Sequence, residues 1–202
     1  MNWLNQLIFW IPLVVTVGVL LWLFREDILK ASIPVPKLKK AIIIVIGVTV
    51  LQYLSRIGLF YWSLRKDPLG MYLLPAQGTN YFIQSVSAMT KVFLLNILVA
   101  IGLVFIVILI KRLTQRPLFE ESDLYVIFLA SFLVGFPGIF ILFMAAFLLM
   151  IIWQLAGRLV FKTVLNQSRL RVSPFLIFVA LIHLVLVNFY FYQNFLGYVH
   201  LI

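Results

Sequence analysis

Five apolar stretches, each long enough to form a membrane-spanning helix, dominate the sequence. They are residues 3–24, 41–63, 92–110, 124–153 and 175–198. The first has 22 residues, which gives a helix of about 33 Å, more than the ~30 Å hydrocarbon core of a bilayer. Hydrophobic residues make up 64% of the chain and charged residues 11%. A water-soluble chain of 202 residues cannot bury so much apolar surface. The sequence therefore predicts an all-α, polytopic helical bundle with the lipid bilayer around it.

The fourth apolar stretch allows two interpretations. It has Gly135-Phe136-Pro137-Gly138 near its middle. Pro lacks a backbone N–H and Gly tolerates unusual dihedral angles, so this sequence favours a turn between two helices. A single kinked and tilted helix is the alternative.

The distribution of Lys and Arg favours two helices. Residues 25–40, 111–123 and 154–174 are rich in basic residues, whereas the long segment 64–91 has few. The positive-inside rule places the first three segments in the cytoplasm. The fourth stretch then starts and ends on one side and must cross twice, with its turn at the outer face. The six predicted spans, in one domain with both termini outside, are residues 3–24, 41–63, 92–110, 124–136, 138–157 and 175–198. Residues 124–135 are short for a full span, so protein should surround that helix.

Charge and composition exclude several classes of site. The net charge of +10 resides in short loops beside apolar segments, so we expect no nucleic-acid partner. Without cysteine there is no disulfide and no thiolate metal site. The two histidines, His183 and His200, are far apart, so we expect neither a metal nor a haem cofactor. The oligomeric state is not determined by the sequence.

The six acidic residues are unevenly placed. Asp67 lies in segment 64–91, and the other five lie at the predicted cytoplasmic boundary: Glu26, Asp27, Glu120, Glu121 and Asp123. One interpretation is that they form ion pairs with basic neighbours. The other is that two carboxyl groups converge and share a proton, as in an aspartyl protease, because adjacent carboxylates do not both ionise readily.

Three short sequences follow one another along the chain. Asp27 precedes Pro34 by seven residues in Asp-Ile-Leu-Lys-Ala-Ser-Ile-Pro, which resembles the first catalytic motif of the type IV prepilin and preflagellin peptidases. Glu120-Glu121-Ser122-Asp123 stands at the place of the family's Gly-x-Gly-Asp. Ser173-Pro174-Phe175-Leu176 is similar to the entry into its last helix. The resemblance covers nearly the whole chain and also implies six helices.

The resemblance implies a membrane aspartyl peptidase with Asp27 and Asp123 as its catalytic pair. The substrate would be a small single-helix membrane protein with a basic leader, like a prepilin, cleaved at the cytoplasmic face of the plasma membrane. Three glutamates, Glu26, Glu120 and Glu121, would attract the basic leader. Their alternative role is pairing with Arg25, Lys111 or Arg112.

Two departures from the family pattern leave a second interpretation open. Glu120 and Ser122 stand where the motif has glycines, and Tyr125 stands where a Lys commonly follows. The glycines allow close packing of backbone around the aspartate. The chain is therefore either a peptidase or a catalytically inactive, peptidase-like scaffold or subunit. The absence of cysteine also means that there is no Cys-rich insert of the kind linked to N-methylation. A small transporter is less well supported, because the carboxylates lie at the boundary and not at mid-membrane.

Overall fold

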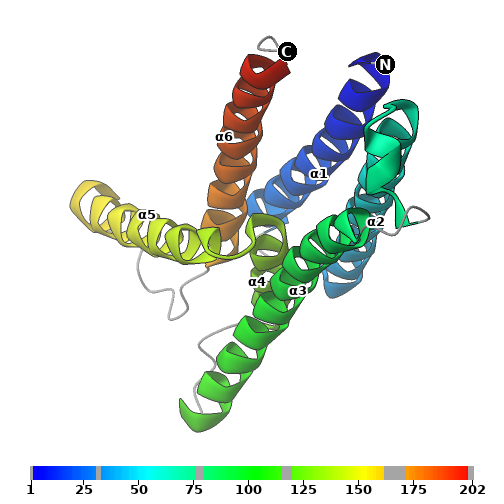
Figure 1. Cartoon of the computed structure of the whole chain (residues 1–202). Coiled ribbons are helices and arrows are strands. Elements are labelled where there is room, and N and C mark those ends of the chain that lie inside the picture. Colours follow the sequence, from blue (N-terminus) through cyan, green and yellow to red (C-terminus); the bar gives the residue numbers. More distant parts are fainter. Residues whose placement is uncertain (1, 31–32, 76–79, 115–119, 162–171, 200–202) are drawn as a thin grey trace.

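The structure is a bundle of α-helices, confirming the predicted all-α class. The computed structural model describes residues 2–30, 33–75, 80–114, 120–161 and 172–199, and no strand occurs among them. The helices are α1 (Asn2–Lys30), α2 (Val35–Lys66), the 3₁₀ helix η1 (Gly70–Leu73), α3 (Tyr81–Thr114), α4 (Glu121–Val134), α5 (Gly138–Phe161) and α6 (Ser173–Val199) (Figure 1).

Most of these helices have the length and composition of membrane spans. Within the described residues, four are long and apolar enough to cross a bilayer: Gln6–Leu29, Val35–Lys66, Tyr81–Thr114 and Gly138–Ala156. The described apolar part of α6, Ser173–Val187, is shorter. Large apolar side chains point away from the bundle, as at Ile43 (70% exposed) and Trp153 (71% exposed). Surface of this kind requires lipid, so the chain is a membrane protein.

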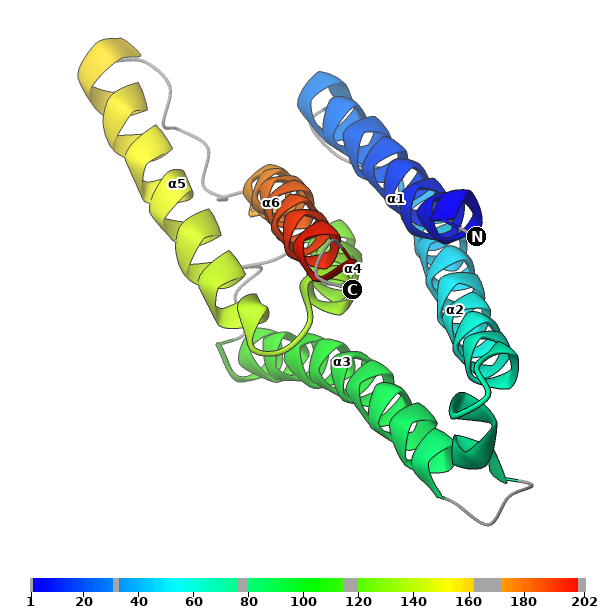
Figure 2. The same cartoon turned by 45° about the horizontal axis from the view of Figure 1, so that its top comes forward.

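Helix α4 differs from the others because protein surrounds it. Its 14 residues extend about 21 Å, less than the thickness of a hydrocarbon core. Half of them are buried, among them Val126, Ile127 and Leu129. Helix α4 packs against α2, α3, α5 and α6, and α1 packs against α2 and α6. Figure 2 shows α4 and α6 between α5 on one side and α1 with α2 on the other.

The fourth apolar stretch forms two helices, α4 and α5, so the interpretation as one kinked helix is wrong. Gly135 ends α4 with a φ of 68°, in the region that favours glycine. A Cβ there would also lie 2.7 Å from Asn96 Nδ2. The Phe136 N–H donates to Asn96 Oδ1 at 3.2 Å. An α3 side chain thus satisfies an irregular backbone group of the turn between α4 and α5.

The hydrogen bond to Asn96 shows where along α3 this turn lies. That residue is four positions, or about 6 Å along the helix axis, inside the predicted span 92–110. The turn therefore lies beside the part of α3 that the charge pattern assigns to the outer half of the membrane. It stops well short of the end of α3 at Tyr81, because α4 is too short to reach that end.

Helices extend beyond the predicted spans at the membrane boundaries. Helix α3 begins at Tyr81 and not at residue 92, and α2 begins at Val35 and not at residue 41. Segment 64–91 is therefore largely structured, with η1 between α2 and α3. Of the basic residues used for the topology prediction, Arg116, Lys162, Arg169 and Arg171 lie outside the described residues.

Candidate active site

Two of the six acidic side chains are buried, and they are the two predicted catalytic aspartates. Asp27 is 5% exposed and Asp123 is 3% exposed. Asp27 continues the buried face of α1, which also contains Thr16, Leu20 and Leu23 at intervals of three and four residues. Helical periodicity therefore directs Asp27 into the bundle, one turn before α1 ends.

Asp123 is fixed by the local sequence at the start of α4. It is the third residue of the helix and forms a capping box with Glu120, the residue before the helix. The Glu120 N–H donates to Asp123 Oδ2 at 2.9 Å, and the Glu120 side chain accepts from the Asp123 N–H. Carboxylates in the first turn also interact favourably with the helix dipole.

Ser173, the first residue of α6, connects the two aspartates. Its side chain is 4% exposed, and its Oγ donates to Asp27 Oδ2 at 2.6 Å. Ser173 also lies close enough to Asp123 to affect the pKa of that carboxyl group. Val172 and Leu176 are buried beside it. The end of α1 and the starts of α4 and α6 therefore meet at one end of the bundle and bring two carboxyl groups to one hydroxyl.

Burial raises the pKa of Asp123 above its ordinary value of 3.8. The Glu120 N–H opposes this effect by stabilising the carboxylate, whereas the negative charges of Glu120 and Asp27 raise the pKa further. The nearby Ser173 hydroxyl lowers the pKa of Asp123. A carboxyl group with a raised pKa beside a second carboxyl group can supply an acid and a base at the same pH.

The three glutamates predicted to bind substrate occupy different environments. Glu26 Oε2 pairs with Lys37 Nζ at 2.8 Å, and Lys37 lies 5.7 Å from the Trp22 ring centre. The partner of Glu26 is thus a lysine of α2 that was not among the residues expected for this pairing. Glu120 is held in the capping box. Glu121 is exposed.

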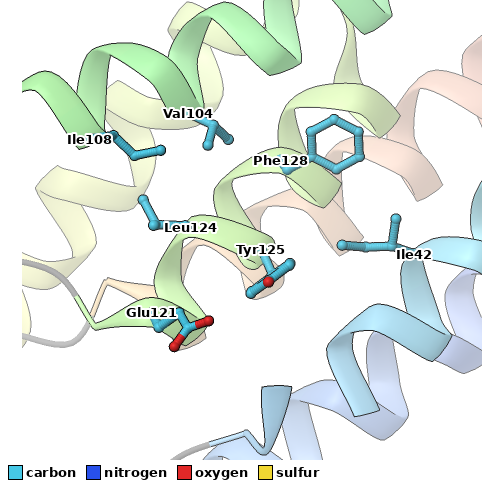
Figure 3. A pocket seen from close by; sticks show the side chains of 7 residues that line it. All are labelled: Ile42, Val104, Ile108, Glu121, Leu124, Tyr125 and Phe128. Atoms are coloured by element: carbon cyan, nitrogen blue, oxygen red, sulfur yellow. The ribbon is translucent and has the colours of Figure 1, made fainter. Parts of the chain in front are cut away.

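A cavity of about 390 Å³ lies between α2, α3 and α4 (Figure 3). Its lining is almost entirely apolar and comprises Ile42, Val104, Ile108, Glu121, Leu124, Tyr125 and Phe128. Glu121 provides the only charge at its edge, and Lys39 Nζ lies 5.9 Å from the Tyr125 ring centre. Two residues along a helix correspond to about 200° of rotation, so Asp123 lies on the other side of α4 from Tyr125. The cavity and the aspartates are therefore separate features.

No group of three or more His, Asp or Glu side chains capable of holding a metal occurs in the part of the chain that the structure describes. Comparison of the chain with protein-family models, curated proteins and solved structures finds no match. Functional inference therefore depends on the residues of this chain. Sequence reasoning did not select Ser173; the available signal was a serine before a proline at the start of the last apolar stretch.

Proposed function

We propose that the chain is an aspartyl endopeptidase of the plasma membrane. Its substrates are small single-helix membrane proteins with basic leaders, similar to prepilins, and it cleaves them at the cytoplasmic face. The observation that carries this proposal is the burial of Asp27 and Asp123 around the Ser173 hydroxyl. A buried carboxyl pair in which one group has a raised pKa is costly to maintain, which is why such pairs are concentrated at functional sites.

The pair can hydrolyse a peptide bond without a cofactor. Ionised Asp27 removes a proton from water as the water oxygen attacks the carbonyl carbon. Protonated Asp123 gives its proton to the carbonyl oxygen, which yields a tetrahedral diol. The diol collapses as its C–N bond breaks. Asp27 then protonates the departing amine and the diol returns a proton to Asp123, so both groups regain their initial states.

Glu121 suits the basic part of such a substrate. Glu121 is exposed at the start of α4, where a carboxylate attracts a basic leader. Glu26 contributes less attraction, because Lys37 already neutralises its charge.

One observation favours the alternative, an inactive scaffold with a peptidase-like bundle. Asp123 completes a capping box with Glu120, so a structural role alone accounts for a carboxylate at that position. The glycines of the family motif are replaced by Glu120 and Ser122.

Cleavage of a reporter with a basic leader and one apolar helix tests the proposal. Asp27→Asn, Asp123→Asn and the double variant should each lose nearly all activity, and by similar amounts, because the two groups act as a unit. Asp67→Asn is the control, since Asp67 is exposed and lies in the segment assigned to the outer face. Full activity in either single variant would leave the scaffold as the better description.

A further inference from the structure

The cavity between α2, α3 and α4 is a site that the proposed peptidase chemistry does not use. Its volume of about 390 Å³ is within the range of about 300–1,000 Å³ found for ligand pockets, which are mostly apolar with a few polar groups that fix orientation. Ile108, on the α3 side of the lining, is 43% exposed. The cavity therefore opens toward the surface that the bilayer covers, and an apolar ligand can enter it from there.

The cavity has a charged end and an apolar end. On α4, Glu121, Tyr125 and Phe128 follow one another at intervals of four and three residues, so they share one face of the helix. Glu121 and Phe128 are about 10 Å apart along the helix axis. Figure 3 shows them at opposite ends of the α4 part of the lining. The cavity therefore runs from the start of α4 into the apolar interior of the bundle.

A cation lies beside the charged end. Lys39 is three residues before the lining residue Ile42, on the same side of α2, and its Nζ lies 5.9 Å from the Tyr125 ring centre. Lys39 and Glu121 are both exposed, and neither forms an ion pair with another described residue. Both belong to segments that the charge pattern assigns to the cytoplasmic boundary. One cation and one anion are thus available at the level of the lipid head groups.

We propose that this cavity binds one acyl chain of a phospholipid whose head group carries a primary ammonium, as in phosphatidylethanolamine. The acyl chain occupies the apolar part of the cavity. The lipid phosphate pairs with the Lys39 ammonium, and the lipid ammonium donates hydrogen bonds to the Glu121 carboxylate. A lipid with a net negative head group, such as phosphatidylglycerol, would leave Glu121 without a cation and place a second negative charge near it. Such a lipid is therefore held less tightly.

This inference goes beyond the proposed peptidase activity and does not depend on it. A lipid in the cavity contacts α2, α3 and α4 together, so its binding stabilises the packing of α4 between the other two helices. In the proposed peptidase, Glu121 also attracts the basic leader. Lipid and leader therefore compete for the same carboxylate, and the test is made without substrate.

Photocrosslinking tests the proposal. The full chain is placed in phosphatidylcholine nanodiscs that contain a small amount of phosphatidylethanolamine with a diazirine in its acyl chain, and mass spectrometry locates the labelled residues after illumination. We expect labelling to concentrate on the cavity lining, and unlabelled phosphatidylethanolamine to displace it about 5-fold better than phosphatidylglycerol, the effect of about one charge at a membrane surface. Labelling spread evenly over the exposed apolar helix faces, or equal displacement by the two lipids, would overturn the proposal.

Single variants examine the two charges. Lys39→Gln and Glu121→Gln should each lower labelling of the cavity about 5-fold, and Glu121→Gln should also remove the preference for phosphatidylethanolamine over phosphatidylglycerol. Lys40→Gln is the matched control: Lys40 is also exposed but points about 100° away from Lys39 around α2, so its loss should change little. Unchanged labelling in both Lys39→Gln and Glu121→Gln would contradict the proposal.

A further pair of variants examines the acyl-chain part. Val104→Phe fills part of the cavity and should abolish labelling of its lining. Ile106→Phe, at a position of α3 that is 50% exposed and does not line the cavity, should not. Labelling around Trp153, which is 71% exposed, should be constant in all variants and shows that each is folded in the bilayer. Cavity labelling that persists in Val104→Phe would mean that the lipid binds elsewhere.

Discussion

The Glu120 N–H donates to Asp123 Oδ2 at 2.9 Å, so the carboxyl group proposed for catalysis also completes the first turn of α4. The Asp123 side chain therefore has a structural role as well as its proposed chemical role. They are separable, because an asparagine carbonyl oxygen can accept the same hydrogen bond but cannot exchange a proton.

Asp123→Asn and Asp123→Ala should accordingly differ in stability but not in activity. Both should abolish cleavage. The Ala variant should lose about 1 kcal/mol relative to the Asn variant, because an orphan N–H at the helix start loses its acceptor. Thermal unfolding in detergent measures the difference. Equal unfolding temperatures would mean that the capping box contributes nothing measurable.

The raised pKa of Asp123 predicts a pH dependence of stability. Its folded-state pKa lies above the ordinary value of 3.8, so the folded state binds the proton more tightly than the unfolded state. The resulting stabilisation is fully present below about pH 4 and is lost as pH rises through the folded-state pKa. The Asp123→Asn variant has no titrating group at this position, so it is the reference for the comparison.

The unfolding temperature of wild type, compared with that of Asp123→Asn, should therefore fall as pH rises above about 4 and level off above the folded-state pKa. If the unfolding temperature of wild type relative to Asp123→Asn instead rises with pH, hydrogen bonding to the Asp123 carboxylate outweighs burial and the pKa of Asp123 is lowered.

Glu121 should contribute to substrate capture. Glu121→Gln should raise KM, more at low salt than at high salt, because salt screens the attraction between an exposed carboxylate and a basic leader. The matched variant Glu26→Gln should raise KM less, since Glu26 is already paired with Lys37. A KM change that is independent of salt would assign Glu121 a packing role at the edge of the cavity.

The apolar pattern predicted the helices well but not their limits. Six helices and a turn at Gly135–Gly138 follow from apolar length and from the properties of Gly and Pro. Hydropathy does not detect the helical turns that lie outside the hydrocarbon region, because water solvates those turns and their side chains need not be apolar. Residues 81–91 mix polar and apolar side chains and were therefore assigned to a loop, although α3 includes them.

The site was predictable to the extent that it is local. The acidic residues at helix ends and the capping box can be seen in the sequence around Asp123. The contact between Ser173 and Asp27 cannot, because it joins residues 146 positions apart and depends on how α6 docks. The Glu26–Lys37 pair was missed for a similar reason: it depends on how α1 and α2 pack.

The contact between Gly135 and Asn96 gives the last prediction. A Cβ at Gly135 would lie 2.7 Å from Asn96 Nδ2, and the φ of 68° is unfavourable for alanine. Gly135→Ala should therefore destabilise the protein by at least about 1 kcal/mol. Gly102→Ala, in the middle of α3 with nothing within 4 Å of its Cβ, should be neutral or stabilising.

Asn96→Ala separates the two causes of that cost. Alone, it removes the acceptor of the Phe136 N–H, at a cost of about 1 kcal/mol. In Asn96→Ala/Gly135→Ala the steric conflict is gone while the unfavourable φ remains. The double variant should therefore lose less stability than the sum of the single losses. Strict additivity in thermal unfolding would show that backbone conformation alone requires glycine at residue 135, and that Asn96 acts only as a hydrogen-bond acceptor for the turn.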